Sequence, residues 1–185
     1  MVYEKEEILQ YVIEEDVKFI RLAFCDVTGK QKNISIQLDE LERAFEYGIA
    51  FDASAVPGFG SEIHSDLFLQ PDTGTLCVLP WRPDHGRVVR MFCNILHPDG
   101  TPFASDTRRV LQNAVDAAAE RGISFSFGSE MEFYLFQRDE NGEATRVPYD
   151  RAGYMDIAPE DKGENIRREI CLTLSQMGIR PECSH

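Results

Sequence analysis

The fold begins with a hairpin encoded by residues 17–36, which read VKFIRLAFCDVTGKQKNISI. Residues 17–25 are rich in β-branched and aromatic side chains that partly alternate with polar ones, as in a half-buried strand. The turn-forming residues 26–30 separate this run from a second alternating run at residues 33–36. The sequence therefore predicts two strands joined by a tight turn.

Helices and further strands flank this hairpin. Before it, apolar residues recur at helical spacing between residues 4 and 15, which predicts an amphipathic helix. After it, Asp39 and Glu42 have the spacing of a capping box, and Gly48 is placed to end the helix that they would open. Four more strands are expected, at residues 49–51, 66–70, 76–79 and 87–95. Together these elements predict a small α+β domain that ends near residue 103.

A change of composition separates two domains. Residues 97–102 read HPDGTP, and two prolines with a glycine in so short a stretch disfavour helix and strand alike. We place the boundary directly afterwards, which gives domains at residues 1–103 and 104–185. The second domain is expected to contain a helix from Asp106 to Gly122, a strand at 124–136, a polar excursion at 137–163 and a helix at 165–177. The chain ends soon after that helix, so this domain is expected to be incomplete.

The charge balance excludes two classes of partner. The chain has 32 Asp and Glu against 19 Lys and Arg, and a net charge of -13 repels nucleic acid and anionic membranes. No stretch approaches the roughly 20 apolar residues of a membrane span, and the N-terminus lacks the pattern of a signal peptide. The 5 cysteines have no metal-site spacing and fit reduced thiols. We therefore expect a cytoplasmic protein.

The strongest candidate for chemistry lies in the predicted strand at residues 124–136. Its odd positions from Phe125 are mostly apolar, whereas its even positions include Glu130 and Glu132. Because strand side chains alternate, the two carboxylates would share one face with Cα atoms roughly 6.6 Å apart. Oxygen ligands so placed suit Mg²⁺ or Mn²⁺. The solvated face of an ordinary strand explains the same pattern, and the spacing leaves both interpretations open.

A second candidate is the segment from Asp52 to Asp66, which consists largely of small and turn-forming residues. This composition predicts a mobile surface loop, and loops on a rigid scaffold often carry function. Asp52 has the chemistry to accept a proton or hold a cation there. A plain surface connection in which Asp52 caps a turn accounts for the pattern equally well.

Several short motifs follow one another along the chain. They are Phe51-Asp52-Ala53-Ser54, Ser65-Asp66-Leu67, Gln70-Pro71-Asp72, Pro98-Asp99-Gly100-Thr101-Pro102 and Gly128-Ser129-Glu130-Met131-Glu132-Phe133-Tyr134-Leu135-Phe136. In order and spacing, these motifs closely resemble those of bacterial class I glutamine synthetases. The resemblance covers essentially all 185 residues. It implies an N-terminal β-grasp domain followed by the truncated start of the α+β catalytic domain, so the chain is expected to be an N-terminal fragment.

The resemblance also implies a reaction, in which ammonia is ligated to glutamate through γ-glutamyl phosphate with ATP as a substrate. Two divalent metals, Mg²⁺ or Mn²⁺, serve each full-length site of the family. Glu130 would hold the metal that bridges to the nucleotide phosphates, and Glu132 the metal nearer glutamate. Asp52 would bind ammonium and take its proton in the active site of a neighbouring subunit, and Tyr154 would lie beside the ammonium pocket. The family forms homo-oligomers, with a dodecamer expected for the full-length protein.

Two departures from the family pattern keep alternatives open. Residues 52–55 read DASA where the family usually has DGSS, so one hydroxyl is missing. The blocks that supply further metal ligands, arginines and most of the nucleotide pocket are absent, so the fragment is expected to be inactive alone. The alternatives are a γ-glutamyl-amine (polyamine) ligase of the same fold, a non-catalytic structural or regulatory relative, and a free-standing β-grasp binding module. The pair Glu130 and Glu132 argues against the non-catalytic relative, and the elements after Gly100 argue against the module.

Overall fold

The computed structural model describes residues 3–60, 66–81 and 86–185 of the chain. These residues divide into two units, Met1–Phe125 and Ser126–His185. Within the described ranges, no helix is long and apolar enough to cross a membrane.

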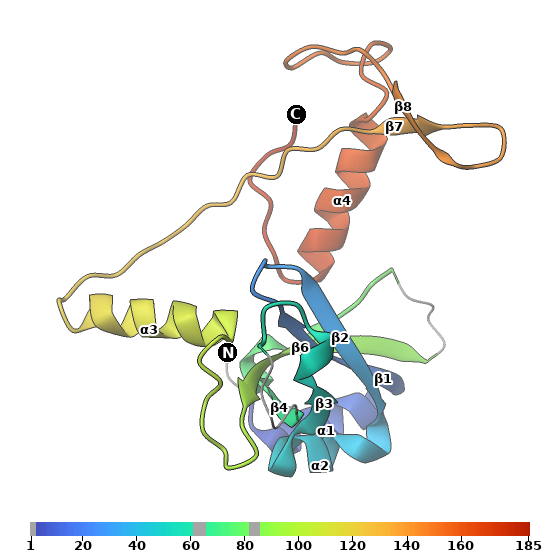
Figure 1. Cartoon of the computed structure of the whole chain (residues 1–185). Helices are drawn as coiled ribbons and strands as arrows, with labels where there is room; N and C mark the ends of the chain where they lie inside the picture. Colours follow the sequence, from blue (N-terminus) through green and yellow to red (C-terminus); the bar gives the residue numbers. More distant parts are fainter. Residues whose placement is uncertain (1–2, 61–65, 82–85) are drawn as a thin grey trace. The chain divides into compact units, whose positions relative to one another are not determined.

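A sheet with the strand order β2-β1-β6-β4-β3 is the centre of the first unit (Figure 1). Its strands are β1 (Val17–Cys25), β2 (Gln31–Gln37), β3 (Ile49–Asp52), β4 (Asp66–Pro71), β5 (Cys77–Val78) and β6 (Arg87–Leu96). β1 and β2 form the predicted antiparallel hairpin, in which Ile20 lies opposite Ile36. β1 also pairs with β6, and this pairing is parallel, whereas β6 pairs with β4 and β5 in antiparallel fashion. The strands predicted for the first domain are thus all present.

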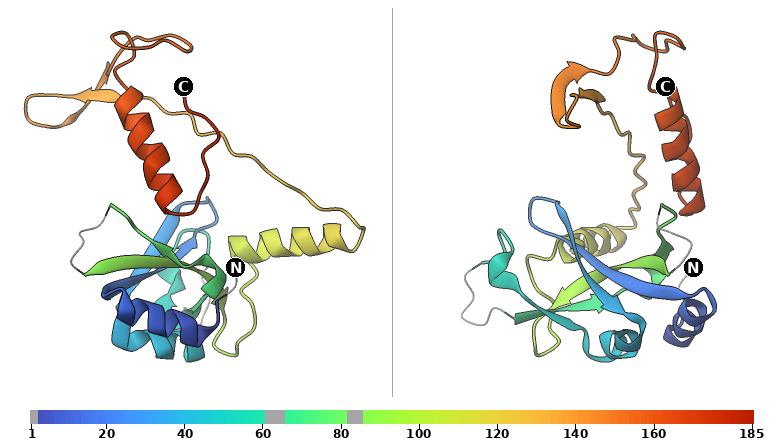
Figure 2. Two further views of the ribbon diagram at one scale, coloured as in Figure 1. Left: turned by 180° about the vertical axis from the view of Figure 1, so that it is seen from behind. Right: turned by 90° about the vertical axis from the view of Figure 1, so that its right-hand side faces the viewer.

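Two helices cover one face of this sheet (Figure 2). α1 (Lys5–Glu14) buries Ile8 and Val12 against it, as the helical spacing predicted. α2 (Leu41–Tyr47) follows the 3₁₀ turn η1 (Leu38–Glu40). The strand and helix side chains of this layer form one hydrophobic core, whose fully buried members include Ile8, Val12, Ile20, Leu22, Leu41, Leu67, Leu69, Val89, Met91 and Ile95.

The end of α2 agrees with the sequence pattern, but its beginning does not. Gly48 ends the helix with φ +74, and a Cβ at this position would lie 3.1 Å from the carbonyl oxygen of Leu69, so the position requires glycine. At the beginning, the capping box expected from Asp39 and Glu42 is absent, because Asp39 lies within η1 and Glu40 is the N-cap of α2, without a side-chain cap hydrogen bond.

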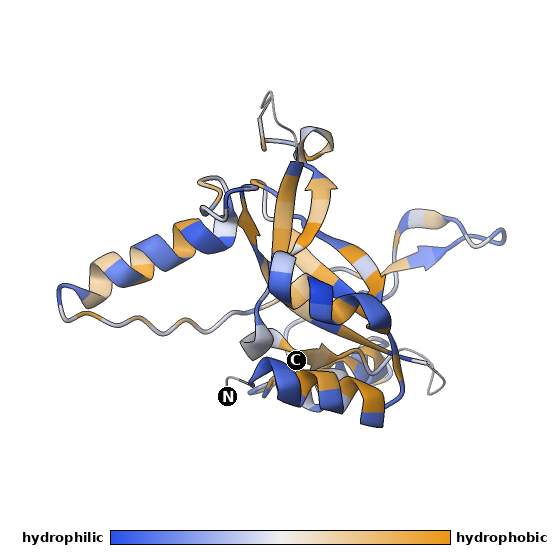
Figure 3. Ribbon diagram, turned by 90° about the horizontal axis from the view of Figure 1, so that it is seen from below, coloured by the Kyte–Doolittle hydropathy of each residue, from blue (hydrophilic) through white to orange (hydrophobic). Residues whose placement is uncertain are grey.

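α3 (Thr107–Ala119) is joined to the first unit at its N-terminus. Asp106 is its N-cap: one carboxylate oxygen accepts from the backbone N–H of Arg108 and the other from the N–H of Ile95 in β6, both at 3.0 Å. Arg108 in turn forms an ion pair with Asp72. Apolar residues recur along α3 (Figure 3), yet none of its residues is buried, and Leu111 is 63% exposed. By these contacts α3 belongs to the first unit, and the domain boundary after residue 103 stays a prediction.

The second unit contains a hairpin and a helix. β7 (Phe136–Arg138) and β8 (Ala144–Pro148) pair in antiparallel fashion inside the stretch that we expected to be a polar excursion. α4 (Glu164–Gln176) confirms the helix predicted at residues 165–177. Just before it, the buried Asp161 forms an ion pair with the partly exposed Arg167 at 2.5 Å.

The strand predicted at residues 124–136 is wrong. Only Phe136 belongs to a strand, and residues 124–135 are not assigned to one. The alternation of apolar residues suggested one buried face, but Phe127 is 90% exposed and Met131 is 83% exposed. A strand needs the backbone of a neighbour to complete its hydrogen bonds, and the described residues show such pairing from Leu135 onward, whose carbonyl accepts from the Tyr149 N–H at 2.8 Å.

Candidate active site

Asp52 ends β3 and caps the 3₁₀ turn that follows it, η2 (Ala53–Ala55). One of its carboxylate oxygens accepts from the backbone N–H of Ser54 at 2.9 Å and from the hydroxyl of Ser54 at 2.6 Å. The residue is exposed to solvent. The turn-capping role that the sequence suggested is therefore present, and it fixes the orientation of an exposed carboxylate. The proton-accepting role stays a prediction.

The segment after Asp52 is more firmly packed than a surface loop. Ala53, Val56 and Phe59 are buried. Phe59 lies against Phe51 and Phe103, with ring centroids 6.4 Å and 5.1 Å away. Residues 61–65 of the predicted loop lie outside the described residues. Residues 53–60 are thus anchored by these three buried side chains, while the other residues of the segment are exposed.

Glu130 and Glu132 lie in the extended segment before β7, and both are exposed. The strand face on which we expected them is not formed, because residues 124–135 are not part of a strand. The described residues also do not gather three or more His, Cys, Asp or Glu into a metal site. Carboxylate oxygens nevertheless have the donor chemistry that fits Mg²⁺ or Mn²⁺, and two of them leave most positions of an octahedral ion to other ligands.

Tyr154 lies in the turn between β8 and α4, and its side chain is 79% exposed. Its ring contacts that of His185 edge to face, with centroids 5.2 Å apart and planes at 87°. No local spacing in the sequence relates these two residues, because they are far apart in the chain. Asp52 belongs to the first unit, whereas Glu130, Glu132 and Tyr154 belong to the second.

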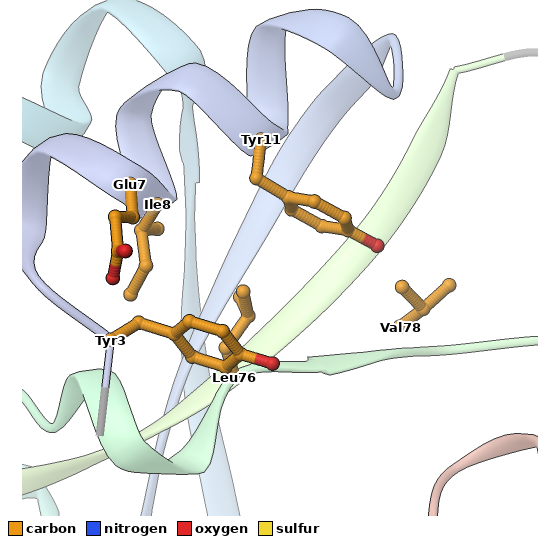
Figure 4. A pocket seen from close by; sticks show the side chains of 6 residues that line it. All are labelled: Tyr3, Glu7, Ile8, Tyr11, Leu76 and Val78. Atoms are coloured by element: carbon orange, nitrogen blue, oxygen red, sulfur yellow. The ribbon is translucent and has the colours of Figure 1, made fainter. Parts of the chain in front are cut away.

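A pocket of about 300 Å³ lies elsewhere, between α1 and the segment around β5 (Figure 4). It is lined by Tyr3, Glu7, Ile8, Tyr11, Leu76 and Val78. Burial raises the pKa of the Tyr11 phenol, and the nearby Glu15 carboxylate adds to this effect. None of the residues that we singled out from the sequence lines this pocket.

Comparison with known families agrees with this architecture. One family model, for a β-grasp domain, matches residues 16–98, and a second, for a catalytic domain, matches residues 104–185. The chain is thus of the class in which a β-grasp domain precedes an enzyme's catalytic domain. Both models describe glutamine synthetase, and the chain belongs to the glutamine synthetase family. The match to the catalytic domain contradicts the interpretation as a free-standing β-grasp module.

Individual relatives give the same result. The chain is 46% identical over 183 residues to the glutamine synthetase of Clostridium saccharobutylicum, a match that covers 99% of this chain and 41% of the relative. It is 44% identical over 181 residues to the glutamine synthetase of Methanosarcina mazei, which covers 98% of this chain and 40% of the relative. The cryo-EM structure of Plasmodium falciparum glutamine synthetase matches with a TM-score of 0.77 and 18% identity, over 99% of this chain and 42% of that chain. That likeness confirms the predicted fold class.

Proposed function

We propose that this chain is part of an enzyme that ligates ammonia to glutamate at the expense of ATP, through γ-glutamyl phosphate. The observation that carries this proposal is that a single chain matches both the β-grasp and the catalytic domain of glutamine synthetase. Relatives that share 46% and 44% of its residues are named glutamine synthetases, and the chain spans 41% and 40% of their lengths. The substrates would be ATP, glutamate and ammonium, with ADP, phosphate and glutamine as products.

Asp52 would act on ammonium. Ammonium has no lone pair, so it must lose a proton before its nitrogen can attack the acyl phosphate. An exposed carboxylate attracts the cation and can accept that proton. The two donors of Ser54 hold the carboxylate in one orientation, which favours a fixed position for the bound ammonium. Tyr154 would line the same pocket with its exposed ring.

Glu130 and Glu132 would hold the divalent cations, Mg²⁺ or Mn²⁺. When bound, such cations neutralise phosphate charge and orient the nucleotide. The two carboxylates are separated by one residue in an extended segment, so one short stretch of backbone can present ligands to two adjacent ions. The family resemblance assigns Asp52 to the site of a neighbouring subunit, so we expect a homo-oligomer.

The test is a chimeric enzyme in which this chain replaces the matching part of the Clostridium saccharobutylicum relative. We expect the chimera to form glutamine, and Asp52→Asn to lower kcat/KM for ammonium by about 10²- to 10⁴-fold, the usual contribution of a general base. The KM for ATP should change little. Asp39→Asn, which alters another exposed aspartate of the first unit, is the matched control and should leave kcat/KM unchanged.

Mixed assemblies sharpen this test. Subunits with Asp52→Asn are combined with subunits carrying Glu132→Gln, so that some shared sites pair an intact Asp52 with intact metal ligands. Partial activity should return. Mixed assemblies that form by mass spectrometry and stay as inactive as either parent would count against a site shared between subunits. A chimera that assembles and makes no glutamine would contradict the proposed reaction.

A further inference from the structure

Two turns of the first unit lie side by side, the β1–β2 turn and the segment that follows Asp52 (Figure 1). The β1–β2 turn is held by Asp26, whose side chain is almost completely buried. One carboxylate oxygen of Asp26 accepts from the N–H groups of Thr28 and Lys30, both at 3.0 Å, and from the hydroxyl of Thr28 at 2.6 Å. The other oxygen lies 3.3 Å from the ammonium of Lys32. These bonds hold the turn in a single shape, which fixes the backbone of Val27.

Val27 contacts the backbone of the segment after Asp52 at Gly58. A Cβ built on Gly58 would lie 2.1 Å from one methyl of Val27 and 3.1 Å from the other. Gly58 also has φ +83, a conformation that other residues rarely adopt. The Val27 side chain therefore occupies the space next to the Gly58 backbone, and the two surfaces fit only because position 58 has no side chain.

The same segment is held on its other side by aromatic packing. Phe59 is 3% exposed, and its ring centroid lies 6.1 Å from that of Phe24 in β1. It also contacts Phe51, the residue before Asp52. Backbone hydrogen bonds from Val56 to the Ala53 carbonyl (3.0 Å) and from Phe59 to the Val56 carbonyl (3.2 Å) connect consecutive turns along the segment. These two hydrogen bonds therefore couple the backbone at position 58 to the turn that contains Ser54.

We propose that Val27 is a positioning residue for Asp52. Its methyl groups fix the backbone at Gly58, the connected turns transmit that position to Ser54, and the two donors of Ser54 orient the Asp52 carboxylate. The relevance of this arrangement to ammonium capture rests on the proposed function. The arrangement itself is a property of the first unit, so it is tested separately.

The structural test compares two glycine substitutions in the 185-residue chain. Gly58→Ala introduces a Cβ that meets Val27, whereas Gly142→Ala, in the β7–β8 turn of the second unit, introduces one at a similar φ of +82 with nothing within 4 Å. Both substitutions therefore carry a similar backbone strain, and only the first carries the clash. In NMR spectra, Gly58→Ala should shift the Ser54 amide and the Asp52 carboxyl signals, and Gly142→Ala should leave both unchanged. Adding Val27→Ala to Gly58→Ala removes both clashing methyl groups and should restore the signals in part.

Val27→Ala alone covers the case in which Gly58→Ala does not fold. It removes the contact without adding a clash, and it should speed hydrogen exchange of the Ser54 amide by about tenfold, since local opening follows loss of packing. Unchanged Ser54 exchange and Asp52 signals in this variant would overturn the proposal. So would a folded Gly58→Ala chain whose Asp52 and Ser54 signals match the wild type.

The chimeric enzyme then tests whether the position of the Asp52 carboxylate affects the use of ammonium. Val27→Ala should lower kcat/KM for ammonium by about 10-fold or more through a misplaced carboxylate, with the KM for ATP unchanged. If the NMR signals move and ammonium use does not, the positioning holds and the role proposed for Asp52 fails. If ammonium use falls while the signals of Asp52 and Ser54 stay in place, Val27 acts by another route and the positioning proposal is overturned.

Discussion

Leu22 and Phe127 are both apolar residues in alternating stretches of sequence, but Leu22 is 0% exposed and Phe127 is 90% exposed. Among the described residues, every buried hydrophobic side chain lies at or before Phe103. In the second unit only Asp161 and Gly163 are buried. The first unit has a sheet face covered by two helices, whereas the second has a two-stranded hairpin and a single helix, too few layers to enclose a core. Alternation thus leads to burial only where a second layer is available.

Truncating one apolar side chain in each unit tests directly whether only the first unit has a closed core. We expect Leu22→Ala to lower the free energy of unfolding of the first unit by about 2–5 kcal/mol, because it leaves a cavity in a closed core. Phe127→Ala should change the stability of the second unit by less than about 0.5 kcal/mol. Fluorescence of Trp81, the single tryptophan, reports the first measurement in urea, and hydrogen exchange of α4 amides reports the second. Equal losses would show that the second unit has a core of its own.

Asp106 tests whether α3 belongs with the first unit. Asp106→Ala removes both the cap of α3 and the acceptor for the Ile95 N–H, which leaves a buried donor without a partner. We expect a loss of about 1–3 kcal/mol, with faster hydrogen exchange at Ile95. Asp106→Asn keeps an oxygen acceptor, so its loss should be smaller. If Asp106→Ala leaves Ile95 exchange and Trp81 unfolding unchanged, α3 is not coupled to the sheet.

The smallest effect that we predict concerns the Asp26 carboxyl group and the pH dependence of stability that its titration produces. Hydrogen bonds from the Thr28 hydroxyl and from backbone N–H groups lower the pKa of Asp26 to about 2 from an ordinary 3.8. A lowered pKa in the folded state stabilises the first unit fully above about 3.8, and this stabilisation is lost as the pH falls toward 2. Asp26→Asn should therefore be less stable at neutral pH and show a flatter pH dependence between pH 4 and 2, measured by thermal unfolding. An equally steep dependence in the variant would assign the acid sensitivity to other carboxyl groups.

The helices and the β1–β2 hairpin could be predicted because their hydrogen bonds join residues that are near in sequence. Gly48 and Gly178 mark helix ends for the same local reason. Local patterns could not show whether residues 124–136 form a strand, because the partner strand would be distant in sequence. The β7–β8 hairpin was missed although its turn, residues 139–142, contains the hairpin signal Asn141-Gly142. Its strands are short and lack a sustained alternation of apolar and polar residues.

The residues of the candidate site could be proposed from the sequence, and their roles stay predictions, whereas the packing around them could not be predicted. Asp52 and the pair Glu130 and Glu132 stood out by residue type and by family motif. The packing of Phe59 beneath the Asp52 segment and the fit of Gly58 against Val27 arise from contacts between separate strands and turns. No periodicity in the sequence reports such contacts. The same holds for the contact between Tyr154 and His185.

The parallel pairing of β1 with β6 governs the order in which the first unit can be assembled. β1 has β2 as a partner almost at once, but its other edge finds β6 only after residues 87–92 have been synthesised. Until then, the backbone N–H and C=O groups along that edge are open to any other extended chain. During synthesis on the ribosome, one edge of the nascent β1–β2 hairpin therefore has unpaired backbone groups until β6 becomes available. Proteins that bind emerging chains would have their longest opportunity during this interval.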